Sequence, residues 1–121
     1  MKFQKILVVD DSPTELHMVT DILNRHKVPE IITATNGLEA VAKSAAEMPD
    51  LILMDVVMPE MNGFQATRKI KKNPDTAGIP VIIISSKDQE TDKVWGKRQG
   101  ADEYLTKPVQ EAELIKVMES L

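Results

Sequence analysis

The sequence predicts an α/β fold in which a parallel sheet is covered by helices on both faces. Two observations lead to this prediction. Short apolar runs rich in Val and Ile alternate with segments whose apolar residues recur at helical spacing, and the alternation spans the 121-residue chain. Runs of this kind are typical of strands buried on both faces of the sheet, as in a doubly wound α/β fold.

Five segments are expected to be strands, because each is short, apolar and bounded by residues typical of turns. They are residues 5–10, 30–34, 51–55, 80–85 and 103–106. Such (βα)5 sheets commonly have the flavodoxin-like strand order 2-1-3-4-5, in which ligands bind where strands one and three lie side by side.

The helices between the strands begin at recognisable capping signals. Ser12-Pro13-Thr14-Glu15 has the form of a capping box with Pro at the first helical position. Asn36 and Asn62 are placed to cap the second and third helices, and Asp88 to cap the fourth. The second helix is expected to bury a face of residues spaced i, i+3, i+4 and i+7, namely Leu38, Val41, Ala42 and Ala45.

Length and composition predict one cytoplasmic domain over residues 1–121, with no output domain attached. The chain has no Cys, which excludes a disulfide framework and thiolate chemistry. Its apolar runs are far shorter than the roughly 20 residues that span a bilayer, and no signal peptide precedes the first strand. The net charge of −4 gives no support to nucleic-acid binding. Neither membrane insertion nor a nucleic-acid partner is therefore expected.

Carboxylates follow two of the most apolar segments. Asp10 and Asp11 come directly after the first predicted strand, and Asp55 ends the third. In the order 2-1-3-4-5 they meet at one edge of the sheet. Such a cluster raises its own pKa values unless a cation lies within it. Oxygen ligands without His or Cys suit a hard cation, so the sequence predicts a Mg²⁺ site.

The same edge has the groups that phosphoryl transfer requires. A carboxylate such as Asp55 can act as a nucleophile and form an aspartyl phosphate. Lys107 and Ser85 follow or end later strands, and they would pair with, or donate to, phosphoryl oxygens. Because phosphoryl transfer needs mainly positioning and charge neutralisation, these residues predict a phosphoacceptor site.

An ordered set of motifs runs through the chain: VVDDS at residues 8–12, LMDVVMP at residues 53–59, Gly63, Ser85 and Lys107-Pro108. With this set the chain resembles, over its whole length, the receiver domain of two-component response regulators. It is most similar to the stand-alone, chemotaxis-type regulators. The resemblance implies a partner that donates the phosphoryl group, either a histidine kinase or a phosphotransfer domain.

The resemblance also implies roles for single residues. It makes Asp55 the phosphoacceptor and Asp10 and Asp11 the acidic pair that binds the metal. The backbone carbonyl of Val57 becomes a further Mg²⁺ ligand. Lys107 takes the place of the family's lysine and is expected to precede a cis peptide bond to Pro108.

A conformational switch follows from the same resemblance. Phosphorylation would draw the hydroxyl of Ser85 toward the new oxygens, and Tyr104 would move inward in response. The downstream protein partner would then bind the fourth helix, the fifth strand and the fifth helix. The residues expected to decorate this face are Lys93, Trp95, Lys97, Arg98 and Tyr104.

A finer resemblance concerns the pathway. Residues 62–68 and 88–101 are similar to receivers that govern type IV pilus twitching motility. We therefore expect a role in twitching motility or chemotaxis, performed by a signalling phosphoacceptor that assists its own phosphorylation and dephosphorylation and is not a turnover enzyme. The oligomeric state is left open.

Three other interpretations compete with this one. An FMN-binding flavodoxin has the same architecture, but the loop at residues 10–14 offers two carboxylates and Pro13 where phosphate needs backbone amides. An aspartyl phosphatase of the haloacid-dehalogenase type needs a carboxylate two residues after the nucleophile, where this chain has Val57. A receiver that binds partners without phosphorylation is the third, and the complete acceptor set argues against it.

Overall fold

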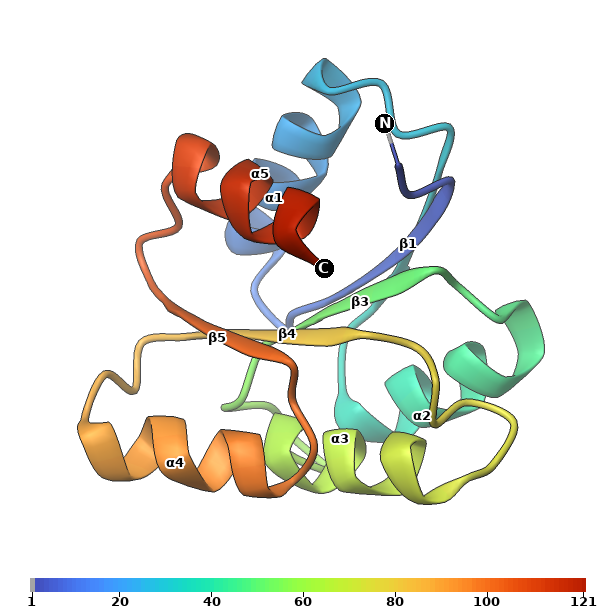
Figure 1. Ribbon diagram of the computed structural model, residues 1–121, viewed down its shortest axis with the longest axis vertical. Helices are drawn as coiled ribbons and strands as arrows, with labels where there is room; N and C mark the ends of the chain where they lie inside the picture. Colours follow the sequence, from blue (N-terminus) through green and yellow to red (C-terminus); the bar gives the residue numbers. More distant parts are fainter. Residues whose placement is uncertain (1) are drawn as a thin grey trace.

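A computed structural model describes residues 2–121, which form an alternating series of strands and helices (Figure 1). The strands are β1 (Lys5–Val9), β2 (Glu30–Ala34), β3 (Leu51–Met54), β4 (Val81–Ser85) and β5 (Glu103–Thr106). The helices are α1 (Pro13–Arg25), α2 (Gly37–Glu47), α3 (Gly63–Lys72), α4 (Glu90–Arg98) and α5 (Glu111–Ser120).

The strands form one parallel sheet in the order β2-β1-β3-β4-β5, which confirms the predicted topology. Val9 at the end of β1 pairs with Met54 at the end of β3. The two strands therefore end level with each other. The residues that follow them, Asp10 after β1 and Asp55 after β3, leave the sheet at the same edge.

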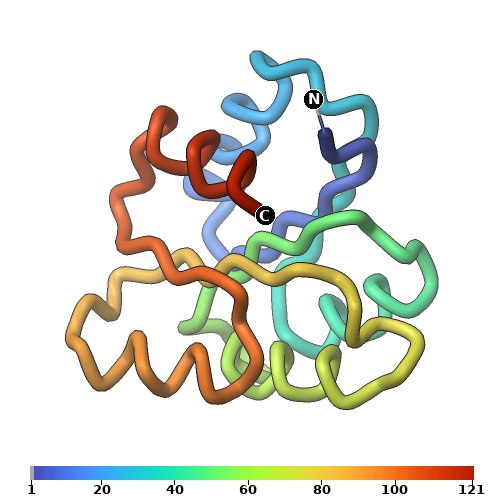
Figure 2. The backbone as a smooth tube through the Cα atoms, viewed as in Figure 1, coloured from blue at the N-terminus to red at the C-terminus, as the bar shows by residue number. Residues whose placement is uncertain are grey.

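Helices cover both faces of the sheet. Helices α1 and α5 lie on one face, and α2, α3 and α4 lie on the other (Figures 1 and 2). Alternate residues of β1 point to the two layers, because successive strand side chains face opposite ways. Ile6 packs in the core beneath α1 and α5, whereas Leu7 packs in the core on the other face.

Side-chain caps start the first and third helices. Ser12 accepts a hydrogen bond from the Glu15 N–H at 3.4 Å. Its own N–H donates to Asp10 Oδ1 at 2.9 Å, so half of the predicted capping box is replaced by a contact to the acidic site. Asn62 and Gln65 form a complete reciprocal box at the start of α3.

The predicted cap of the fourth helix was wrong by one residue. Helix α4 begins after Gln89, not after Asp88. The N–H of Gln89 donates to Asp92 Oδ2 at 3.2 Å. A carboxylate in the first turn of the helix therefore accepts the N–H of the capping residue.

The predicted apolar face of α2 is correct only at Val41, which is partly buried and packs against the core, and wrong at the other three residues. Gly37, Ala40 and Ser44 are buried, while the side chain of Leu38 is 51% exposed. The reason is a close approach of backbones: a Cβ at Gly37 would lie 2.3 Å from the carbonyl oxygen of Met61. Small residues therefore face inward, and the larger one is left outside.

Within residues 2–121 no helix has the length and apolar character that crossing a membrane would require.

Candidate metal and phosphoryl site

Carboxylates gather at the carboxyl edge of the sheet. One oxygen from each of Asp10, Asp11 and Asp55 lies within 4.8 Å of the others. Asp10 and Asp55 are 5% and 6% exposed, and Asp11 is exposed. The structure thus brings together the three residues predicted to hold Mg²⁺, because the neighbouring strands β1 and β3 end at the same level.

Lys107 follows β5, the strand at one end of the sheet, and its side chain reaches back to this cluster. Its Nζ lies 2.9 Å from Asp10 Oδ2 and 3.3 Å from Asp55 Oδ1. The backbone N–H of Lys107 donates to the carbonyl of Ser85 at 2.9 Å, which fixes the strand end from which the side chain reaches inward. The Lys107–Pro108 peptide bond is cis, as the resemblance implied.

The electrostatics of the site favour a cation. Burial raises the pKa of Asp55 to about 6, and repulsion from Asp10 adds to the rise, while Lys107 opposes it. Burial lowers the pKa of Lys107, but its bonds to Asp10 and Asp55 outweigh this and the pKa is raised overall. The cluster thus contains three carboxylates and one ammonium, which contacts Asp10 and Asp55. The all-oxygen donor set and its surplus negative charge fit a hard divalent cation such as Mg²⁺.

The loop after Asp55 is held by the first residues of two helices. The N–H of Gly63 donates to the Val56 carbonyl at 2.9 Å, and the N–H of Gly37 donates to the Met61 carbonyl at 3.0 Å. A Cβ at Gly63 would lie 1.9 Å from the Asp55 carbonyl oxygen. Both glycines therefore let the first residues of a helix pack closely against the loop that follows Asp55.

The sequence did not predict that these two glycines pack against the loop after Asp55. Gly63 belongs to the ordered set of motifs, and Gly37 directly follows the capping Asn36. A glycine directly after an Asn cap at both helices is the signal that the sequence offers. Val57 lies in the same loop, with its side chain 59% exposed, and the ligand role of its carbonyl stays a prediction.

Ser85 and Tyr104 are connected through one residue that the sequence did not link to them. The Oγ of Ser85, fully buried at the end of β4, accepts the N–H of Lys87 at 3.1 Å. The hydroxyl of half-buried Tyr104 donates to the carbonyl of Lys87 at 2.7 Å. Both hydroxyls therefore hold the backbone of the loop that follows β4.

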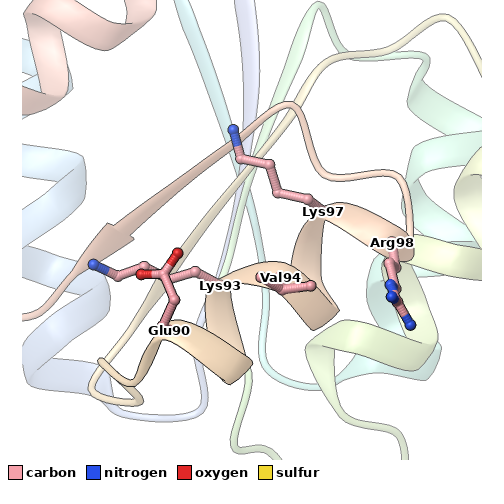
Figure 3. Close-up of a pocket in the computed structure, with 5 residues that line it drawn as sticks. All are labelled: Glu90, Lys93, Val94, Lys97 and Arg98. Atoms are coloured by element: carbon pink, nitrogen blue, oxygen red, sulfur yellow. The ribbon is translucent and has the colours of Figure 1, made fainter.

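The residues predicted for the partner face divide between two flanks of α4. On one flank the side chains of Lys93, Lys97 and Arg98 spread around Val94 in a groove of about 390 Å³ (Figure 3). Trp95 lies in a different groove, which it shares with residues of α3. Trp95 therefore lies on a different flank of α4 from Lys93 and Lys97, because residues two positions apart on a helix point about 160° from each other.

Comparison with known proteins is consistent with this geometry. Residues 6–119 match the response regulator receiver domain. The chain is 55% identical over 117 residues to Protein PilH of Pseudomonas aeruginosa, covering 97% of this chain and 96% of PilH. It is also 40% identical over 111 residues to Protein PilG of the same organism, covering 92% and 82% of the two chains.

Solved structures share the fold. The receiver domain of the sensor histidine kinase PA1611 from P. aeruginosa, which has a magnesium ion in its active-site cleft, matches with a TM-score of 0.87 at 27% identity and covers 97% of this chain and 95% of its own. CheY in the CheX–CheY–BeF3–Mg²⁺ complex of Borrelia burgdorferi matches with a TM-score of 0.90 at 28% identity, covering 96% and 87%. The flavodoxin and phosphatase interpretations are thereby set aside, and the chain belongs to the response regulator receiver domain family.

Proposed function

We propose that the protein accepts a phosphoryl group on Asp55 from the phosphohistidine of a histidine kinase or phosphotransfer domain. The observation that carries this proposal is the position of the Lys107 ammonium, which lies 3.3 Å from Asp55 and 2.9 Å from Asp10. A buried carboxylate beside a fixed cation is suited to nucleophilic attack on a phosphoryl group whose charge needs neutralisation.

In the transfer, an Asp55 carboxylate oxygen forms a bond to phosphorus while the bond between phosphorus and the imidazole nitrogen of the donor breaks. The imidazole leaves, and Asp55 becomes an acyl phosphate. Lys107 pairs with a phosphoryl oxygen, and the hydroxyl of Ser85 donates to another. Asp10, Asp11, Asp55 and the Val57 carbonyl would hold Mg²⁺, which when bound neutralises charge on the transferring group.

Hydrolysis of the acyl phosphate returns Asp55 to its starting state. The protein then acts as a signalling phosphoacceptor that assists its own phosphorylation and dephosphorylation, not as a turnover enzyme. The proposed location of this exchange is the cytoplasm, where phosphorelay partners use ATP-derived phosphoryl groups.

Phosphorylation is read out through the loop after β4. When Ser85 donates its O–H to a phosphoryl oxygen, its Oγ moves toward that oxygen and draws away from the Lys87 N–H that it accepts. Because Tyr104 holds the carbonyl of the same residue, a shift of the Lys87 backbone changes the position of the ring. The switch proposed for Ser85 and Tyr104 therefore acts through Lys87.

The partner face proposed for the switched state consists of α4, β5 and α5. Its groove around Val94 is lined by three cations and one carboxylate, Glu90, and this net positive charge suits a partner with carboxylates around an apolar side chain (Figure 3). The similarity to PilH and PilG supports a pathway that controls twitching motility or a chemotaxis-like response.

The test is an intact-mass measurement after incubation with Mg²⁺ and acetyl phosphate. One added phosphoryl group is expected on the parent protein and none on Asp55→Asn. The cognate kinase, once identified, provides a second donor. Failure of both donors to produce an adduct would favour a receiver that binds partners without being phosphorylated.

A further inference from the structure

Helix α3 has a cationic surface outside the phosphoryl site. Its sequence, GFQATRKIKK, contains no acidic residue. Exposed Arg68, Lys69 and Lys72 line a groove of about 340 Å³, which Glu60 also lines with one carboxylate. Among residues 2–121, no ion pair joins any of these three cations to a carboxylate.

A second hollow continues this groove toward α4. Arg68 and Gln65 line both hollows, and the second, about 290 Å³, is completed by residues that include Trp95 and Gln99. The Trp95 side chain is 48% exposed, which is a large apolar surface to leave in water. Gln99, which is 7% exposed, places its side-chain amide beside this ring. The hollow thus offers an aromatic ring and a side-chain amide beside a row of cations.

We propose that this α3–α4 groove binds an acidic segment of a partner protein. The carboxylates of that segment would pair with Arg68, Lys69 and Lys72, and an apolar side chain about one helical turn away would pack on Trp95. Aromatic and Arg side chains are the residues that most often anchor protein interfaces. Charge complementarity selects an acidic partner and sets its register in the groove.

Other occupants fit less well. A small molecule needs a deep pocket that encloses most of its surface, whereas these two hollows lie open along a helix. A nucleic acid would meet a protein of net charge −4 and a cationic row only about 15 Å long, the length of a ten-residue helix. This surface lies on the opposite flank of α4 from the groove in Figure 3, so the proposal goes beyond the phosphoryl switch.

The test uses the full chain and a random peptide library displayed on phage. Peptides selected on the parent protein are expected to contain Asp or Glu one helical turn from Leu or an aromatic residue. A synthetic copy of the selected peptide should change the fluorescence of Trp95, the single Trp of the chain, in a saturable way. Arg68→Glu/Lys72→Glu should weaken its binding by about tenfold or more.

The matched control is Lys2→Glu/Lys27→Glu, which makes the same change of charge at exposed positions away from both grooves and should leave the affinity unchanged. The proposal is overturned if no peptide is selected, if the selected peptides lack acidic residues, or if both double variants lose binding equally. It is also overturned if an oligonucleotide quenches Trp95 as well as the peptide does. A dimer seen by light scattering that Arg68→Glu/Lys72→Glu abolishes would assign the groove to a second copy instead.

Two measurements keep these outcomes interpretable. Circular dichroism and urea unfolding verify that the Arg68→Glu/Lys72→Glu variant folds, which is expected because both side chains are exposed. The acetyl phosphate adduct should form on this variant as on the parent. Loss of peptide binding with the adduct retained separates the groove from the phosphoacceptor site.

Discussion

Gly96 of α4 and Tyr104 of β5 lie so close together that a Cβ at position 96 would be 2.9 Å from Cδ2 of the ring. Glycine inside a helix costs about 1 kcal/mol relative to Ala. Here the missing side chain lets α4 rest directly on the ring that is proposed to switch. The same added Cβ would also lie 3.1 Å from the Ile83 Cδ1 in the core.

Replacing Gly96 with Ala should therefore destabilise the protein although Ala favours helices. We expect the free energy of unfolding in urea to fall by about 1–2 kcal/mol, because overpacking outweighs the gain in helix propensity. In Gly96→Ala/Tyr104→Ala the clash with the ring is removed and only the 3.1 Å approach to Ile83 Cδ1 remains, so the cost of the alanine at position 96 should shrink in that background. A Gly96→Ala variant more stable than the parent would contradict the packing described here.

Gly63→Ala should damage both stability and phosphorylation. The new Cβ would lie 1.9 Å from the Asp55 carbonyl oxygen, so the loop that begins at Asp55 must move. We expect a loss of about 2–3 kcal/mol in urea unfolding and slower adduct formation with acetyl phosphate. Gly78→Ala is the matched control, because no atom lies within 4 Å of its Cβ position, and it should change stability by no more than about 0.5 kcal/mol.

The pKa of Asp55 predicts how stability depends on pH in the metal-free protein. Its folded value of about 6 lies above its ordinary value of 3.8, so the folded state holds more protons between these pH values. The contribution of Asp55 to the free energy of unfolding is therefore greatest below pH 3.8. This contribution is lost as the pH rises through about 6.

Asp55→Asn should remove this dependence. In EDTA at pH 7 the variant should be more stable than the parent by about 1–2 kcal/mol, and the difference should shrink as the pH is lowered toward 4. Asp75→Asn, at an exposed position, serves as the control for loss of a surface carboxylate. A difference that grows on acidification would mean that Asp55 is stabilised, not strained, by its surroundings.

Lys107→Ala should raise the pKa of Asp55 above about 6, because the ammonium opposes the effect of burial and of Asp10. The carboxyl-carbon NMR shift of Asp55 measures this titration directly. At pH 7 the variant should also form the acyl phosphate about tenfold more slowly or worse, since the loss of one charge-assisted contact to the transferring group costs at least about 1.4 kcal/mol. Lys116→Ala, on an exposed part of α5, should alter neither quantity.

Ser85 and Tyr104 should behave as coupled residues. Tyr104→Phe removes the hydrogen bond to the Lys87 carbonyl, and Ser85→Ala removes the acceptor for the Lys87 N–H. Each change should cost about 0.5–1.5 kcal/mol of stability. Because both bonds hold the same residue, the double variant should lose at least about 0.5 kcal/mol less than the sum of the single losses. Strict additivity in urea unfolding would rule out a connection through Lys87.

Much of the architecture could be predicted from the sequence because its signals are local. Apolar runs marked the strands, and the order 2-1-3-4-5 followed from the few topologies open to a doubly wound sheet. The meeting of Asp10, Asp11 and Asp55 came from the same reasoning, since residues that follow neighbouring parallel strands leave at one edge. The role of Lys107 could be anticipated from its place after β5, although not the two carboxylates that it contacts.

The sequence by itself determined the fold and the composition of the acidic edge, because periodicity and strand ends are properties of short segments. The tertiary structure alone decided which face α2 buries, that Lys87 connects Ser85 to Tyr104, and that Trp95 faces α3. These contacts depend on how closely two backbones approach and on the rotation of each helix about its axis. Both are set by packing between elements far apart in the chain, for which one sequence has no local signal.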